Sequence, residues 1–211
     1  MSRRHDEHEH YYEELKIDTW VESVGRRVSD GDSEAIEEAL AFLERDPYFF
    51  RSGYARERVA RQLAHADLTL SQRARARELV VSTADGARHC PLPGVGRLAG
   101  AVADNSLRRA LRSRLHSDDA SVARRALRIV VHVRRPGLTA DDVEAARALV
   151  LANAARGLWL SPTVARLARY LWSREWEAEL TALLPHHGPQ RAAAKRLVEA
   201  ADRRRRKRPA P

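Results

Sequence analysis

Arginines placed one helical turn apart are the residues of this chain whose type and spacing could bind a ligand. The guanidinium group is always charged, and its planar fork of donors suits phosphate and carboxylate groups. Residues at i and i+4 share one face of a helix, so both members of such a pair point the same way. We expect a polyanion such as nucleic acid to bind three pairs: Arg73 and Arg77, Arg108 and Arg112, and Arg124 and Arg128.

These pairs would form one basic stripe if their helices stack in register, and Arg58, Arg61 and His65 could extend it. The alternative is a solvated surface. In that case the arginine stems cover apolar neighbours and the charged heads stay in water. The sequence does not decide whether the pairs share one surface.

A basic run near the end of the chain is a second candidate polyanion site. It consists of Arg203, Arg204, Arg205, Arg206, Lys207 and Arg208. Like charges repel and nothing apolar anchors the run, so we expect it to be disordered. Six phosphate contacts on duplex DNA would give a salt slope of roughly −5, hence salt-sensitive binding. A merely solubilising tail is the alternative.

The charges are segregated along the chain. Residues 1–50 carry 14 acidic and 6 basic side chains, whereas residues 51–211 carry 15 acidic and 32 basic ones. Only three of the 38 basic residues are lysine. A GC-rich genome would explain the preference for arginine, but it would not explain the segregation of sign, which favours differently charged partners for the two parts.

Aromatic residues gather at two places that could anchor a partner protein or stack on bases. One place holds Tyr48, Phe49, Phe50 and Tyr54, and the other holds Trp172 and Trp176. Packing between neighbouring helix pairs is the alternative explanation for both groups.

Motifs for metal binding or catalysis are weak. His5, His8 and His10 lie on an acidic terminus, and His89-Cys90 has no second pair of ligands nearby. Gly94-Val-Gly96 lacks the preceding strand that a phosphate-binding loop requires. We therefore expect no metal, no cofactor and no catalytic residue, and hence a non-enzymatic protein.

Composition favours a cytoplasmic protein. Cys90 is the sole cysteine, so no disulfide can form within the chain. Residues 1–10 lack the apolar segment of a secretory signal. No apolar run approaches the roughly 18 residues that span a bilayer. We expect membrane binding to be absent, since no amphipathic basic helix supports it.

Helix signals dominate the chain and strand signals are nearly absent. Thr69 and Gln72 have the spacing of a capping box, and Pro162 after Ser161 marks another helix start. Whether residues 161–184 form one helix or two stays open. We expect a disordered acidic, histidine-rich N-terminus over 1–10, a single helical-repeat domain over 11–202, and a disordered basic tail over 203–211.

The segment 118–133 is apolar on nearly every side. Val122, Ala126 and Ile129 fall at helical spacing, and Leu127 and Val131 widen the apolar stripe. A helix of this kind must be covered on two sides, as in stacked helical hairpins. The sequence predicts an all-α fold.

Residues 118–154 resemble one repeat of the HEAT-like family, in which two antiparallel helices pair. The second helix often starts with Asp and continues with Val, Arg, Ala and Leu. Asp119, Val122, Arg125, Ala126 and Leu127 follow that order. The resemblance implies a short, irregular α-solenoid of stacked antiparallel helix pairs; a compact helical bundle is the alternative.

We expect a helical-repeat adaptor or scaffold that binds a protein partner, with a basic C-terminal half and tail suited to nucleic acid or to a nucleic-acid-associated complex. A pure protein-protein scaffold, or a subunit that forms homo-oligomers through acidic-to-basic contacts, is an alternative. The resemblance also implies a DNA-repair glycosylase as an alternative, because some HEAT-like proteins excise alkylpurines. Such enzymes use a basic concave face with tryptophan and an acidic residue, for which Trp159, Trp172, Trp176 and Glu175 are candidates.

Overall fold

The computed structural model describes residues 3–47, 52–88, 92–133, 137–157 and 162–207. These residues form eleven α-helices and no strand, so the predicted all-α class is confirmed. The helices are α1 (Arg3–Ser29), α2 (Ser33–Arg45), α3 (Ser52–Leu63), α4 (Leu70–Asp85), α5 (Leu92–Val102), α6 (Asn105–Leu115), α7 (Ala120–Val130), α8 (Ala140–Ala155), α9 (Pro162–Leu171), α10 (Arg174–Ala182) and α11 (Pro189–Lys207).

Polar caps set the helix starts. Thr69 caps α4 and forms a capping box with Gln72, as the sequence predicts, and Thr139 caps α8 in the same way with Asp142. Asp119 caps α7, and its side chain accepts a hydrogen bond from the amide of Ser121 at 2.7 Å. These short-range bonds satisfy amides that the first helical turn leaves without partners.

The helices form two layers. The odd-numbered helices from α1 to α9 contact one another in succession, and the even-numbered helices from α2 to α8 do the same. We call these the odd layer and the even layer. Helices of the two layers also pack against each other, for example α6 against α7 and α4 against α5. Beyond α9 the pattern changes, because α11 packs mainly on α8 and α10.

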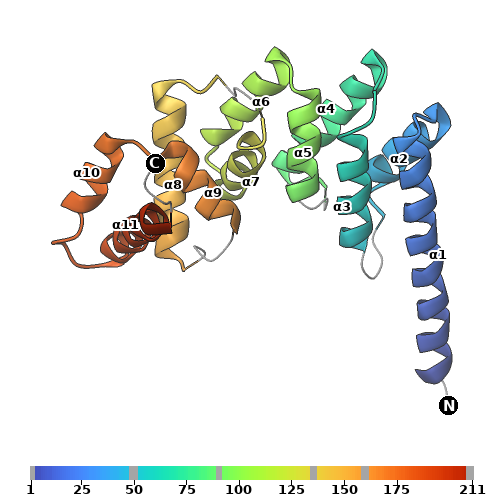
Figure 1. Ribbon diagram of the computed structural model, residues 1–211, viewed down its shortest axis with the longest axis horizontal. Helices are drawn as coiled ribbons and strands as arrows, with labels where there is room; N and C mark the ends of the chain where they lie inside the picture. Colours follow the sequence, from blue (N-terminus) through green and yellow to red (C-terminus); the bar gives the residue numbers. More distant parts are fainter. Residues whose placement is uncertain (1–2, 48–51, 89–91, 134–136, 158–161, 208–211) are drawn as a thin grey trace.

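The two layers curve into an arch (Figure 1). The helices α4 and α6 lie along its outer rim, whereas α3, α5 and α9 lie nearer to its inner side. The N-terminal part of α1 extends away from one end, and α10 and α11 close the other end. The arch thus has an inner surface that belongs mainly to the odd layer.

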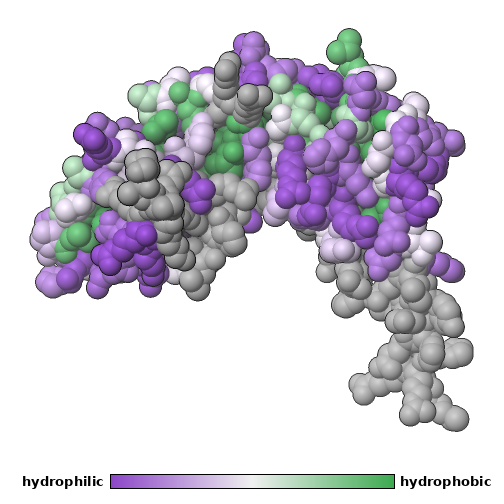
Figure 2. Space-filling view, viewed as in Figure 1, coloured by the Kyte–Doolittle hydropathy of each residue, from purple (hydrophilic) through white to green (hydrophobic). Residues whose placement is uncertain are grey.

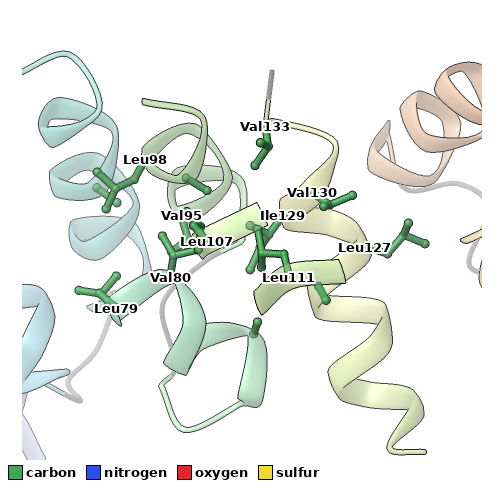
Figure 3. Packing of buried hydrophobic residues seen from close by; sticks show 14 of the residues in the cluster. Leu79, Val80, Val95, Leu98, Leu107, Leu111, Leu127, Ile129, Val130 and Val133 are labelled. Carbon is green, nitrogen blue, oxygen red and sulfur yellow. The ribbon is translucent and has the colours of Figure 1, made fainter. Parts of the chain in front are cut away.

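The core between the layers consists of leucine, valine, isoleucine and alanine. Around its middle, side chains from α4 to α7 converge (Figure 3). Leu79, Leu98, Leu111 and Ile129 are each at most 1% exposed. Burial of such side chains stabilises the fold by about 1.5–3 kcal/mol each. The helix α7 contacts α4, α5, α6, α8 and α9, so it is covered on more than one side as its sequence predicts.

The first and last helices extend into the segments expected to be disordered. The helix α1 begins at Arg3 instead of near residue 11, and α11 continues to Lys207 instead of ending at 202. The structure also settles the open question over 161–184, since Ser173 caps a separate helix, α10. None of the described helices has the length and apolar character needed to cross a membrane.

Candidate anion-binding surface

The two layers separate the predicted arginine pairs. Arg73 and Arg77 lie on α4 and Arg108 and Arg112 on α6, all in the even layer. Arg124 and Arg128 lie on α7 in the odd layer. The three pairs therefore do not form the single stripe that stacking in register would produce.

Arginines of the even layer link neighbouring helices through ion pairs. Arg77 of α4 reaches Asp104, the cap of α6, at 2.6 Å. Arg112 of α6 reaches Asp142 of α8 at 2.6 Å. Further links of the same kind join Arg75 to Glu37 and Glu44 of α2, and Arg114 to Asp85 of α4. Arg77 and Arg112 are thus each paired with a carboxylate of the fold.

Asp142 is the most buried acid of these links. Its side chain is 4% exposed and accepts hydrogen bonds from Thr139 and Arg112, with His116 Nε2 at 2.9 Å. Burial acts to raise the pKa of Asp142, but the hydrogen bonds outweigh it and hold the pKa well below its usual range. The carboxylate stays charged and anchors α6 against the start of α8.

The other two even-layer candidates are also partly engaged. Arg73 Nε donates to the carbonyl of Leu68 at 3.0 Å. Arg108 Nη1 donates to Asn105 Oδ1 at 3.2 Å, whereas its Nε is buried and has no hydrogen-bond partner. Neither side chain belongs to the odd layer.

Glycines bring the odd helices close together around α5. A Cβ at Gly94 would lie 2.9 Å from the carbonyl oxygen of Glu57 on α3. A Cβ at Gly96 or Gly100 would lie 2.4 Å or 2.6 Å from atoms of His132, which follows α7. The Gly94-Val-Gly96 segment is therefore a helix-packing feature, and α3, α5 and α7 form a tight central part of the odd layer.

Arg97 occupies the free side of α5. Val95, Leu98, Ala99 and Val102 are buried, and the glycines face α3 and α7, which leaves Arg97 exposed on the side away from the even layer. It is the sole charged residue in the α5 sequence. Within the described part of the chain it takes part in no hydrogen bond or ion pair.

Arg124 and Arg128 occupy the corresponding side of α7. The buried residues Ala123, Ala126 and Val130 lie on the opposite side of this helix. Both arginines are half-buried, and neither has an acidic partner among the described residues. The two arginines lie one turn apart on the same side of α7.

Two arginines of α3, Arg58 and Arg61, lie near carboxylates that partly compensate their charges. Arg61 contacts Glu57 at 2.8 Å, and Arg58 lies 3.8 Å from Glu22 of α1. Arg58 also lies 5.7 Å from the ring centre of Tyr54, which is 50% exposed.

The helix α9 continues the row with Arg169. It is exposed, on the side opposite the buried Leu167, Ala168 and Leu171. We define the inner arginine face by six residues: Arg58, Arg61, Arg97, Arg124, Arg128 and Arg169. Figure 2 shows hydrophilic side chains gathered over α3 and α5, where the arch is hollowed. All six arginines of the inner arginine face lie on helices of the odd layer.

The outward side of the even layer has a different charge pattern. Exposed acids come from α2, α4 and α8: Glu34, Glu37, Glu78, Asp141 and Glu144. Exposed arginines come from α2, from α6 and from the position directly after α8: Arg45, Arg109 and Arg156. Charges of both signs are therefore mixed on this side. This mixed pattern differs from that of α5, α7 and α9 in the odd layer, whose sequences contain no acidic residue.

The basic run lies largely in a helix. Arg203 and Arg206 are exposed on α11. The side chains of Arg204, Arg205 and Lys207, and the whole of Arg208, lie outside the described residues. The run from Arg203 to Lys207 is therefore attached to the fold through α11, whose residues Ala193, Ala194 and Leu197 are buried.

The aromatic candidates have different environments. Tyr48, Phe49, Phe50 and Trp159 lie outside the described residues. Trp176 is 3% exposed and packs edge-on against Trp172, with ring centres 5.3 Å apart. Trp172 Nε1 also donates to Glu177 Oε2 at 3.0 Å. Trp176 is therefore a core residue.

Sequence reasoning missed Arg97 and Arg169. A usable signal existed for Arg97, since one cation within an otherwise apolar and glycine-rich helix marks the exposed side of that helix. Arg169 has no such signal, because α9 carries a second arginine, Arg166. Among the residues that the structure describes, no group of three or more His, Cys, Asp or Glu side chains could hold a metal ion.

No protein-family model, curated protein or solved structure matches this chain.

Proposed function

We propose that this protein is a non-enzymatic adaptor that binds nucleic acid, or a complex containing it, through the inner arginine face. We propose further that its two curved layers are a short, irregular α-solenoid of HEAT-like helix pairs. The observation that carries the proposal is the set of three central arginines, Arg97, Arg124 and Arg128, which have no acidic partner in the described structure. Their even-layer counterparts Arg77 and Arg112 are paired.

The spacing of the odd helices suits a phosphate backbone. Packed helices lie about 8–10 Å apart, and the glycines of α5 favour the lower end of that range. The guanidinium groups on successive helices are therefore spaced at a distance that a nucleic-acid backbone covers in a few nucleotides. Neutralisation of several phosphates releases counterions and supplies affinity without sequence preference.

The even layer supports the adaptor part of the proposal. Its outward side exposes both acidic and basic residues, so it complements a protein surface of mixed charge better than it complements a polyanion. The acidic N-terminal quarter adds a region that a nucleic acid avoids. Two surfaces of different charge allow one protein to bind nucleic acid and a protein partner together.

The test compares two triple variants of equal charge change. The first replaces Arg97, Arg124 and Arg128 by Glu, and the second replaces three exposed even-layer arginines by Glu: Arg45, Arg109 and Arg156. Binding to labelled duplex DNA, single-stranded DNA and RNA is measured by fluorescence anisotropy at several salt concentrations. At 0.15 M salt the Debye length is about 8 Å, so distant charges contribute little.

We expect the first triple variant to lose at least 30-fold in affinity and the second less than threefold. Equal losses in both would mean that only net charge attracts the nucleic acid, and the inner arginine face would then have no special role. Absence of binding by the unmodified protein at 0.15 M salt would favour the alternative of a pure protein-protein scaffold.

A further inference from the structure

Arg128 differs from the half-buried arginines of other helices, because its guanidinium group has no hydrogen-bond partner among the described residues, whereas Arg108, whose Nε is also buried and unpartnered, donates through Nη1 to Asn105. The Nε of Arg128 is buried and has no hydrogen-bond partner, and burial lowers the pKa of its guanidinium group. Half-buried arginines on other helices have partners: Arg77 and Arg112 contact carboxylates, and Arg147 donates to the carbonyl of Leu171. An arginine remains charged even when burial penalises the charge, so the fold holds an uncompensated cation here.

Two further guanidinium groups belong to the same part of the odd layer. Arg124 precedes Arg128 by one helical turn on α7. His132, one turn after Arg128, lies against Gly96 and Gly100 of α5, so Arg128 is next to the segment of α5 that carries Arg97. All three arginines thus belong to α5 and α7, which pack against each other, and no carboxylate is bonded to them among the described residues.

We propose that Arg97, Arg124 and Arg128 form a phosphate-binding subsite at the boundary of α5 and α7. Because Nε is buried, a phosphate group there accepts a bidentate pair of hydrogen bonds from the two Nη atoms of Arg128, and its remaining oxygens accept from Arg97 and Arg124. This subsite rests on the proposed function. It adds that Arg128 fixes the register of the nucleic-acid backbone on the inner arginine face.

The chemistry favours phosphate over carboxylate. The fork of a guanidinium group matches two phosphate oxygens, and such charge-assisted bonds are roughly twice as strong as neutral ones. A phosphate presents oxygens in a tetrahedral arrangement, so it can serve donors that approach from two helices. A carboxylate offers only two oxygens, which lie in one plane, so it has fewer acceptor directions for donors from two helices.

The first test uses a substitution that keeps the charge. Arg128→Lys retains a cation but removes the planar fork, and Arg109→Lys makes the same change at an exposed even-layer site. Binding of inorganic pyrophosphate and of a twelve-nucleotide single strand is measured by isothermal titration calorimetry. We expect Arg128→Lys to weaken both at least tenfold and Arg109→Lys to weaken neither by more than twofold.

The second test measures stability without a ligand. Arg128→Met removes the uncompensated cation and keeps much of the apolar stem, so the melting temperature should stay the same or rise by about 2–4 °C. Pyrophosphate should raise the melting temperature of the unmodified protein but not that of Arg128→Met. A fall in the melting temperature of the free variant by more than 4 °C would assign Arg128 a structural role and overturn the subsite.

The two probes separate the subsite from the proposed function. If pyrophosphate binding depends on the Arg128 fork but the oligonucleotide does not bind, the subsite stands for a small phosphate compound and the nucleic-acid function fails. If Arg128→Lys binds both probes as well as the unmodified protein, the subsite is wrong. The triple Glu variant then still decides whether the inner arginine face binds nucleic acid through charge alone.

Discussion

Arg112 of α6 and Asp142 of α8 form an ion pair in which Nε and Oδ2 are 2.6 Å apart, and this pair joins two successive helices of the even layer. Thr139 donates to the same oxygen through its amide and its hydroxyl. Asp142 thus caps its own helix and also binds the neighbouring one. A local capping motif and a long-range contact share one carboxylate.

We predict that Asp142→Asn destabilises the fold by about 2–4 kcal/mol, because an amide NH2 would face several donors and leave buried groups unpaired. The melting temperature should fall by roughly 5–15 °C. Thermal unfolding followed by circular dichroism measures the change. Asp141→Asn, at an exposed neighbour on the same turn, is the control and should cost less than about 1 kcal/mol.

The same carboxylate predicts a dependence of stability on pH. The folded-state pKa of Asp142 is lowered, so its contribution is complete above the unfolded pKa of about 3.9 and is lost as the pH falls below that value. The difference in unfolding free energy between the unmodified protein and Asp142→Asn should therefore shrink below pH 4. Urea unfolding from pH 6 to pH 3 measures it. A difference that stays constant over this range would contradict the assignment.

We predict that Gly100→Ala destabilises the protein although alanine is the better helix former. The new Cβ would lie 2.6 Å from the backbone carbonyl of His132, so α5 and α7 would have to move apart, at a cost of about 1–3 kcal/mol. Gly25→Ala is the matched control, because its Cβ meets the flexible end of the Gln62 side chain. Denaturant unfolding of the two variants should show the larger loss for Gly100→Ala; a larger loss for Gly25→Ala would contradict the close packing of α5.

The sequence predicted the elements of this fold because their signals are local. The capping boxes at Thr69 and Thr139 span three residues each, and the apolar stripe of α7 lies within two or three turns. The pairing of two arginines at i and i+4 is equally local. Such features follow from the geometry of one helix and do not depend on how helices are arranged.

The state of each arginine could not be predicted, because its partner lies far away in the sequence. Asp142 follows Arg112 by 30 residues, and Glu44 precedes Arg75 by 31. Whether an arginine is paired therefore depends on which helices become neighbours. The same spacing at Arg124 and Arg128 leaves both without an acidic partner among the described residues, since α5 and α9 contain no acid.

We predict that arginines of the even layer affect mainly stability, whereas arginines of the odd layer affect mainly nucleic-acid binding. Arg77→Gln breaks a partly exposed ion pair and should lower the melting temperature by about 2–4 °C, with nucleic-acid affinity changed less than threefold. Arg97→Gln removes the same charge and should lower affinity three- to tenfold, with the melting temperature unchanged. Anisotropy and thermal unfolding on both variants test this; similar effects on affinity would mean that the layers contribute equally.

The position of the basic run on α11 leads to the last prediction. Truncation after Asp202 removes the six cations of 203–208 but keeps the buried residues Ala193, Ala194 and Leu197 that hold α11 in place. The truncated protein should therefore melt within about 3 °C of the full chain. Its affinity for nucleic acid should fall, and the slope of log affinity against log salt should decrease by up to about 5 on duplex DNA. If binding vanished altogether at 0.15 M salt, the run would be the primary site and the inner arginine face an accessory to it, because the folded arginines would then be unable to hold a polyanion by themselves.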